Sequence, residues 1–200
     1  LYVGSVLLGL AMVGGLLGAF VLALLYPTLP SLESLTDYRP KIPLRVISVD
    51  GDLLGEFGEE RRALVAIREV PDVMINAILA AEDERFYSHG GVDYLSVMRA
   101  AASNLASGTQ QGAGTITMQV ARNFFLTREK TITRKLREVL LAWKIEASLS
   151  KDDILQLYIN QIFLGQRAYG FAAAAQIYFG KSLRDVTPAE AAMLAGLPKA

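Results

Sequence analysis

The 200 residues allow one domain of ordinary size plus an accessory segment. Twenty basic residues balance twenty acidic ones, so the net charge is near zero and gives no support to a general binder of polyanions such as nucleic acid. The chain has no cysteine, which excludes disulfides, thiolate metal sites and cysteine nucleophiles.

Residues 1–26 carry no charged side chain and are predicted to form a transmembrane helix. A helix of this length would extend about 39 Å, more than the ~30 Å hydrocarbon core of a bilayer. A cleaved signal peptide is the alternative, but it would have a basic start, a shorter apolar core and a small-residue cleavage site. Tyr2 and Tyr26 suit the two interfaces. Gly14 and Gly18 have the spacing of a pair that could pack a partner helix, but we favour the simpler interpretation of a glycine-rich anchor.

Residues 27–62 are predicted to be a linker followed by a β-hairpin. The stretch PTLPSLESLTDYRPKIP contains four prolines and is typical of an extended connector. The stretch RVISVDGDLLGEFG then predicts two short strands around Asp50-Gly51, a pair that type I′ turns prefer.

Residues 63–200 are predicted to be mainly α-helical. Pro71 suits the first position of a helix, and apolar residues follow it at helical spacing. Capping-box patterns at Ser150–Asp153 and Thr187–Glu190 start two further helices, the first of which is expected to run to Gly165. The fold class is therefore mainly α, with one small hairpin.

A cluster of ionisable residues, AAEDERFYSHGG, follows directly on the apolar residues of the first of these helices. If that helix continues, Glu82, Phe86 and His89 share one face, and Gly90-Gly91 end the helix. Glu82 would then point into the interior or a cleft, as a general base requires, while Asp83 would face the cleft rim. The alternative is a solvated helix end with His89 near its C-terminus.

The stretch QQGAGTITMQVARNFF places a glycine loop before a helix. Such a loop can present backbone N–H groups to a phosphate, and Arg122 would add a bidentate donor. A disordered surface loop is the alternative. Polar donors lie directly behind the loop at Thr115, Thr117, Gln119, Arg122 and Asn123.

The stretch TRKLREVLLAWKIEASLSK contains Arg134, Lys135 and Glu138 at i, i+1 and i+4. These residues could form an exposed ladder of ion pairs, which would contribute little to stability. Alternatively, they form a basic site for an anionic substrate in which Glu138 orients the two cations. The apolar run VLLAW indicates that one side of this helix packs inside the protein.

Together these segments resemble the peptidoglycan glycosyltransferase domain (glycosyltransferase family 51) of class A penicillin-binding proteins. The family pattern E-D-x-x-F-x-x-H-x-G is matched by Glu82, Asp83, Phe86, His89 and Gly91. The pattern G-x-S-T-I-T-x-Q-x-x-[KR]-N is matched by Gly112, Thr115, Ile116, Thr117, Gln119, Arg122 and Asn123. The pattern R-K-x-x-E is matched by Arg134, Lys135 and Glu138, and residues 151–181 and 187–200 resemble a fourth and a fifth motif.

One position departs from the family pattern, because Gly114 stands where the family usually has serine. The change removes a hydroxyl and loosens the backbone. We expect weaker activity or weaker substrate binding at this position.

The resemblance implies a lysozyme-like, mostly helical domain with a small membrane-proximal lobe. It implies polymerisation of lipid II into β-1,4 glycan strands, with inversion at the anomeric carbon and with moenomycin as the expected inhibitor. The implied organisation is a transmembrane helix at 1–26, a linker and hairpin at 27–62, and a glycosyltransferase domain at 63–200. That domain is expected to be truncated at Ala200, with a transpeptidase domain beyond it. The expected location is the bacterial inner membrane, as a single-pass protein with its catalytic domain on the outer face.

The resemblance also implies roles for the motif residues. Glu82 is expected to be the general base, and Glu138 the second catalytic carboxylate. No tightly bound cofactor and no protein metal ligands are expected, but a divalent cation, Mg or Mn, could accompany the diphosphate. Expected partners are lipid II, the growing glycan chain, the membrane, other cell-wall synthesis proteins, and a second copy through the transmembrane helix. The substrate-binding residues are expected to be Asp83, Phe86, His89, Thr115, Gln119, Arg122, Asn123, Arg134 and Lys135.

Two other functional classes fit parts of this pattern. A lysozyme-like hydrolase would share an acidic residue in a related fold, but it has no diphosphate to bind. A non-enzymatic membrane scaffold would recruit wall-synthesis partners and would not need Glu82.

Overall fold

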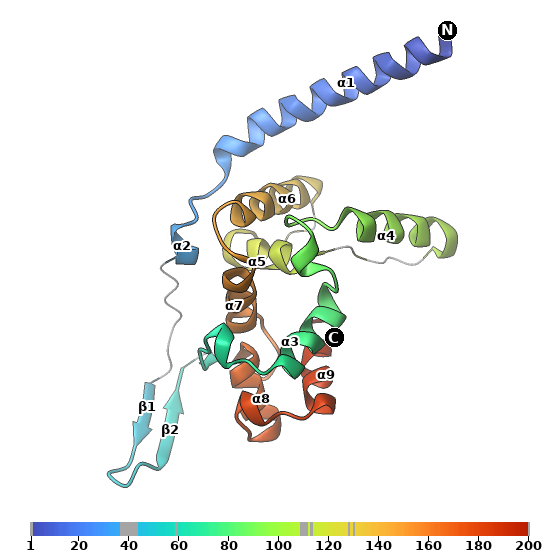
Figure 1. Ribbon diagram of the computed structural model, residues 1–200. Helices are drawn as coiled ribbons and strands as arrows, with labels where there is room; N and C mark the ends of the chain where they lie inside the picture. Colours follow the sequence, from blue (N-terminus) through green and yellow to red (C-terminus); the bar gives the residue numbers. More distant parts are fainter. Residues whose placement is uncertain are drawn as a thin grey trace.

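A long N-terminal helix and a β-hairpin project in different directions from a body of packed helices (Figure 1). The predominance of helices confirms the mainly α prediction. The structure is a computed structural model that describes residues 2–36, 44–58, 60–108, 112, 114–127, 129 and 131–199.

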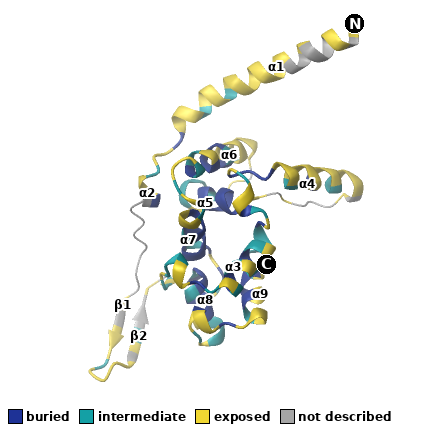
Figure 2. Cartoon of the chain, viewed as in Figure 1, coloured by how far each residue is buried: buried dark blue, intermediate teal, exposed yellow. Residues whose placement is uncertain are grey.

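The N-terminal helix α1 spans Tyr2–Leu25, and most of its described side chains are exposed (Figure 2). Over the part of the chain that the structure describes, no helix is both long and apolar enough to cross a membrane. The structure thus confirms a helix over most of residues 1–26. Its transmembrane placement stays a prediction.

The connector after α1 is not simply extended, as its prolines predicted. It forms a 3₁₀ turn (η1, Tyr26–Thr28) and then the short helix α2 (Glu33–Thr36), while residues 37–43 lie outside the described part. Leu29 and Leu35 are buried in the main core. Burial of these two leucines against the body draws the chain into turns, which proline content alone could not predict.

The predicted hairpin is confirmed: β1 (Leu44–Ile47) pairs antiparallel with β2 (Leu53–Phe57). A type I′ turn requires positive φ at both central residues. Among the residues of this turn only Gly51 has a positive φ, of 92°, so Asp50-Gly51 does not form the type I′ turn that the sequence suggested.

The body contains seven helices among the described residues, joined by short 3₁₀ turns and one small parallel β-pair. The pair joins β3 (Arg61–Arg62) to β4 (Ala168–Tyr169), and no sequence pattern predicted it. The helices are α3 (Asp72–Glu82), α4 (Tyr94–Ser107), α5 (Ile116–Phe125), α6 (Ile132–Glu146), α7 (Lys151–Gln161), α8 (Phe171–Phe179) and α9 (Pro188–Gly196). The 3₁₀ turns are η2 (Ile67–Glu69), η3 (Phe86–Ser88), η4 (Leu183–Asp185) and η5 (Leu197–Lys199).

Local capping signals set several helix starts as predicted. Complete capping boxes at Ser150 and Thr187 begin α7 and α9. Pro71 is the residue that caps α3 and not its first helical residue. Helix α7 ends four residues before Gly165, which instead takes a positive φ of 84° in the turn that leads to β4.

Packing in the body places α5 at the centre of the candidate site. Helix α5 packs against both α6 and α7, and α3 packs against α9. Helix α4 extends away from the body and keeps a row of exposed apolar side chains (Figures 1 and 2). The end of α3, helix α5 and the start of α6 carry the three polar motifs.

Candidate active site

The acidic motif is not a continuous helix. Helix α3 ends at Glu82, and Asp83 has the non-helical angles φ −160° and ψ 75°. A separate 3₁₀ turn then contains Phe86. The prediction that Glu82, Phe86 and His89 share one helical face is therefore wrong.

Asp83 explains why the helix stops. Its carboxylate accepts a hydrogen bond from the N–H of Ile116 (3.1 Å), at the start of α5, and lies 2.9 Å from Nε2 of His89. A carboxylate is stabilised at a helix N-terminus, where unpaired N–H groups point outward. Asp83 lines the same cavity as Glu82 but is buried, so it lies in the cavity wall and not at an exposed rim as predicted. The residue instead links the acidic motif to the glycine-loop motif.

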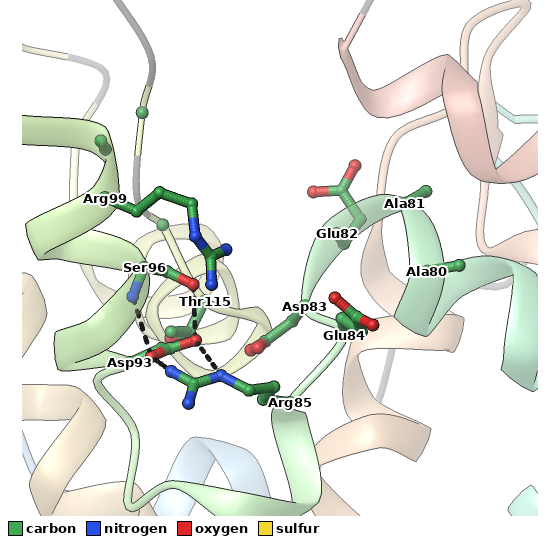
Figure 3. Close-up of a pocket in the computed structure, with 13 residues that line it drawn as sticks. Ala80, Ala81, Glu82, Asp83, Glu84, Arg85, Asp93, Ser96, Arg99 and Thr115 are labelled. Atoms are coloured by element: carbon green, nitrogen blue, oxygen red, sulfur yellow. Dashed lines mark hydrogen bonds and ion pairs between the residues drawn. The ribbon is translucent and has the colours of Figure 1, made fainter. Parts of the chain in front are cut away.

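Gln119 holds the carboxylate of Glu82. Its Nε2 donates to Oε2 of Glu82 across 2.7 Å, from the buried face of α5 to the end of α3. Glu82 itself is half-buried and projects into a cavity (Figure 3). The half-buried position agrees with the predicted orientation toward a cleft, although the helix that carries Glu82 ends there.

This cavity has a volume of about 220 Å³ and lies between the end of α3 and the side of α4. Figure 3 shows Glu82 on one wall and Arg99, from α4, on the opposite wall. Gly112, Gly114 and Thr115 from the second motif complete the lining. Arg99 belongs to no motif recognised in the sequence, and only the tertiary structure brings it opposite Glu82.

A neutralised cluster supports the α4 side of the cavity. Asp93 caps α4 by accepting from the N–H (3.1 Å) and the hydroxyl (2.6 Å) of Ser96, and it forms an ion pair with Arg85. Burial would raise the pKa of Asp93, but the hydrogen bonds from Ser96 and the Arg85 guanidinium hold it well below its usual value. The positive charge of Arg85 is thus neutralised by its ion pair with Asp93.

Two predicted substrate contacts lie inside the protein. Phe86 is fully buried, with Nζ of Lys151 4.3 Å from its ring centroid. Thr115 is also buried; its hydroxyl caps α5 and donates to the carbonyl of Gly91 (2.6 Å). Phe86 therefore packs in the core, away from the cavity lining, whereas Thr115 lines the cavity and also holds the start of α5 against the loop at Gly91.

Gly91 is required by close packing against α6. Its φ is 88°, and a Cβ atom there would lie 3.1 Å from the backbone of Ala142. Any other residue would therefore be both strained and crowded. This contact fixes the loop between the acidic motif and α4.

The third motif is an ion-pair cluster around a buried carboxylate. Glu138 is only 1% exposed, and it accepts from Arg134 (2.5 Å) and Lys135 (2.8 Å). The exposed-ladder interpretation is therefore wrong for Glu138. Because Lys135 is half-exposed and Arg134 partly so, one buried negative charge orients two cations at the start of α6.

Arg122 and Asn123 line a different cavity, of about 390 Å³, between the C-terminal part of α5 and the segment that follows α7. Tyr158, from α7, is buried and senses charges from both cavities. Burial raises the pKa of the Tyr158 hydroxyl, the charge of Glu82 raises it further, and the charge of Arg122 lowers it. Arg122 and Glu82 thus both lie near Tyr158, although they line different cavities.

A further polar network joins three helices near the site, and no sequence pattern predicted it. Glu146 accepts from the hydroxyl of Thr117 (2.6 Å) and from Nζ of Lys151 (2.7 Å). These residues join α5, α6 and α7. Thr117 was recognised only as a donor behind the loop, because its partners lie in distant segments of the chain.

The described residues do not form a metal centre. Among them, no group of three or more Asp, Glu or His side chains gathers closely enough to hold a metal ion. Any role for Mg or Mn alongside the substrate diphosphate therefore stays a prediction.

These motifs and their arrangement agree with a comparison against protein families. Residues 50–200 match the transglycosylase family, and the chain belongs to that family. Among curated proteins, the chain is similar to penicillin-binding proteins. The chain is 61% identical over 193 residues to penicillin-binding protein 1A of Neisseria gonorrhoeae, covering 96% of this chain and 24% of that protein.

A second relative, penicillin-binding protein 1A of Pseudomonas aeruginosa, is 54% identical over 189 residues, covering 93% of this chain and 23% of that protein. The chain thus spans about a quarter of the length of the curated relatives that it matches. A crystal structure of penicillin-binding protein 1A from Haemophilus influenzae aligns with 81% of this chain and 15% of that chain, at 30% identity and a TM-score of 0.37.

Proposed function

We propose that this domain is a membrane-bound peptidoglycan glycosyltransferase that polymerises lipid II into β-1,4 glycan strands. The observation that carries the proposal is Glu82, which projects into a cavity and is held there by Gln119 in a chain of the transglycosylase family. A sugar hydroxyl is a poor nucleophile, so a positioned carboxylate is the group that this reaction needs.

In the proposed reaction, Glu82 accepts the proton of the 4-hydroxyl group of lipid II. The hydroxyl oxygen forms a bond to the anomeric carbon of the growing chain, and the bond from that carbon to the lipid diphosphate breaks. Attack from the opposite side inverts the α-linked diphosphate to a β-1,4 linkage. The diphosphate leaves with the bonding electrons.

The leaving diphosphate needs nearby cations because its negative charge grows as the bond breaks. Arg134 and Lys135 are the proposed cations, and Arg122 is proposed to help position phosphate. Glu138 is buried between the first two and bonded to both, which supports its proposed role in orienting them. A divalent cation, Mg or Mn, could share this charge, and no step here depends on it.

The proposed substrates are lipid-linked, so the proposal places the domain at a bilayer surface. The uncharged segment 1–26 would serve as a single-pass anchor in the bacterial inner membrane, with the domain on its outer face. Confinement to the membrane would reduce the search for substrate to two dimensions. Other wall-synthesis proteins are proposed as partners.

Replacement of Glu82 by glutamine tests the proposed base. The amide keeps the shape of the side chain but cannot accept the proton, so we expect lipid II polymerisation to fall by about 10²- to 10⁴-fold. Asp72→Asn is the matched control, because Asp72 is exposed at the other end of α3. It should retain wild-type activity, and both variants should keep the wild-type circular dichroism spectrum.

The same assays separate the other functional classes. Polymerisation by Glu82→Gln at a near-normal rate would show that the base is assigned wrongly. Cleavage of finished glycan, without polymer formation from lipid II, would identify the wild-type chain as a hydrolase. If the wild-type chain does neither, the scaffold interpretation stands.

A further inference from the structure

An apolar groove lies between α1 and α6, away from the cavity that holds Glu82. It has a volume of about 370 Å³, and we call it the α1–α6 groove. One wall runs from Leu17 to Leu25 on α1, and the other from Leu136 to Trp143 on α6. Every residue that lines it is aliphatic, glycine or tryptophan, so a ligand of this groove must itself be apolar.

Contacts at the end of α1 fix the two walls relative to each other. Lys144, on α6, donates from Nζ to the carbonyl of Pro30 (2.9 Å), and Leu29 and Leu35 are buried in the main core. Leu25 also packs against that core. The C-terminal end of α1 is thus docked on the body beside α6 (Figure 1), and the groove follows from that docking.

Large apolar side chains that line the groove are exposed. Trp143 is 39% exposed, Leu136 42% and Leu17 59%. Exposed apolar surface gathered in one concave place is typical of a binding site, whereas scattered exposed leucines are not informative.

Cations lie at one end of the groove. Lys135 directly precedes Leu136 on α6, and its half-exposed ammonium group shares Glu138 with Arg134. The α6 wall contains Leu136, Val139, Leu140 and Trp143, at the spacing of one helical stripe. From Lys135 to Trp143 the helix rises about 12 Å, so one ligand could place an anionic head on the cations and an apolar tail along the stripe.

We infer that the α1–α6 groove binds the polyprenyl chain of the lipid-linked donor while its diphosphate lies at Arg134 and Lys135. The inference rests on the proposed function for the identity of the substrate. It goes further by giving α1 a part in binding: the N-terminal helix supplies one wall of the lipid site. Charge complementarity favours this occupant over an uncharged lipid.

Trp143 provides a direct test, because it is the only tryptophan in the chain. A polyprenyl diphosphate brominated near the start of its chain would be titrated into the full chain in detergent micelles, with Trp143 fluorescence as the readout. We expect saturable quenching that unlabelled polyprenyl diphosphate reverses and that polyprenol without diphosphate does not. Lys135→Ala should raise the half-saturating concentration by about tenfold, as expected for the loss of one charge-assisted contact.

A groove-filling variant makes the test specific. A Cβ added at Gly18 would meet nothing within 4 Å, so Gly18→Leu fits α1 and places its side chain in the groove. Gly14→Leu is the matched control: Gly14 is equally open and lies one turn away, outside the groove lining. We expect Gly18→Leu to abolish saturable quenching and Gly14→Leu to preserve it.

Two results would overturn the inference. The groove would be an ordinary lipid contact if a brominated phospholipid quenched Trp143 equally and polyprenyl diphosphate did not compete. It would be an interface between copies if Trp143 emission depended on protein concentration at fixed detergent and Gly14→Leu abolished that dependence.

The groove and the proposed function can fail separately. Quenching measured on Glu82→Gln reports binding without catalysis, so it should persist even when polymerisation is lost. Absence of saturable quenching in a wild-type chain that polymerises lipid II would overturn the inference that the groove binds the polyprenyl chain. The proposed function would stay intact. Saturable quenching in a wild-type chain that does not polymerise lipid II would overturn the proposed function and leave lipid binding in the groove intact.

Discussion

At the scale of single residues, Asp83 shows how a motif can be recognised correctly and placed incorrectly. The pattern around Glu82 marked both carboxylates, and helical spacing assigned one to a cleft and the other to its rim. The structure gives Asp83 two partners, His89 and the N–H of Ile116. The second lies 33 residues away in sequence, and no local pattern contains it.

Gly114 offers a prediction at the same scale. A Cβ at this position would meet nothing within 4 Å, so Gly114→Ser can be accommodated and would place a hydroxyl on the cavity wall. We expect a several-fold rise in the kcat/KM of lipid II polymerisation. Stability should be unchanged or higher by about 0.4–1 kcal/mol, because a side chain restricts the unfolded chain.

The variant Gly114→Ala separates the two effects of that change. If the hydroxyl matters, alanine should reproduce the stability of the serine variant but not its activity. Equal kcat/KM in all three proteins would mean that the position tolerates glycine and that the departure from the family pattern has no consequence.

At the scale of elements, the helix starts were the most predictable features. Ser150 and Thr187 form complete capping boxes, as their sequence spacing indicated. These signals could be read because all the interacting groups lie within one helical turn. The end of α3 could not be predicted, because a contact to α5 determines it.

The start of α9 gives a pH-dependent prediction. Hydrogen bonds from Lys181 and from the N–H of Thr187 lower the pKa of Glu190 from 4.5 to about 2. A lowered pKa means that the folded state favours the ionised carboxylate. Its stabilising effect is therefore complete above pH 4.5 and is lost as the pH falls toward 2.

We expect Glu190→Gln to reduce the loss of stability between pH 4.5 and 2, measured by urea denaturation. Lys181→Met removes the largest cause of the lowered pKa and should reduce the same pH dependence. An unchanged pH dependence in both variants would contradict the assignment.

At the scale of the whole molecule, the connector determines how α1 meets the body. Its prolines predicted an extended linker, but Leu29 and Leu35 are buried in the same core as the helices that carry the site. The N-terminal helix is therefore attached through packing as well as through the chain.

Leu35→Ala tests this attachment. Loss of a buried leucine costs roughly 2–5 kcal/mol, and here the cost should appear as local detachment of the connector. We expect faster hydrogen exchange and proteolysis within residues 26–36, with little change in the unfolding transition of the helical body. Ser34→Ala, an exposed change in the same short helix, is the control. Unchanged protection in Leu35→Ala would show that the docking does not depend on Leu35.

The amino-acid sequence alone predicted the helical class, the hairpin, two capping boxes, and the motifs that place the chain in the transglycosylase family. It did so because these features depend on residue spacing within one segment of the chain. Only the tertiary structure showed that Asp83 is buried, that Gln119 holds Glu82, that Arg99 lies across the cavity, and that α1 and α6 form a groove. Each of these depends on contacts between segments that the packing of apolar side chains brings together, and the distances that decide them are not contained in any local pattern.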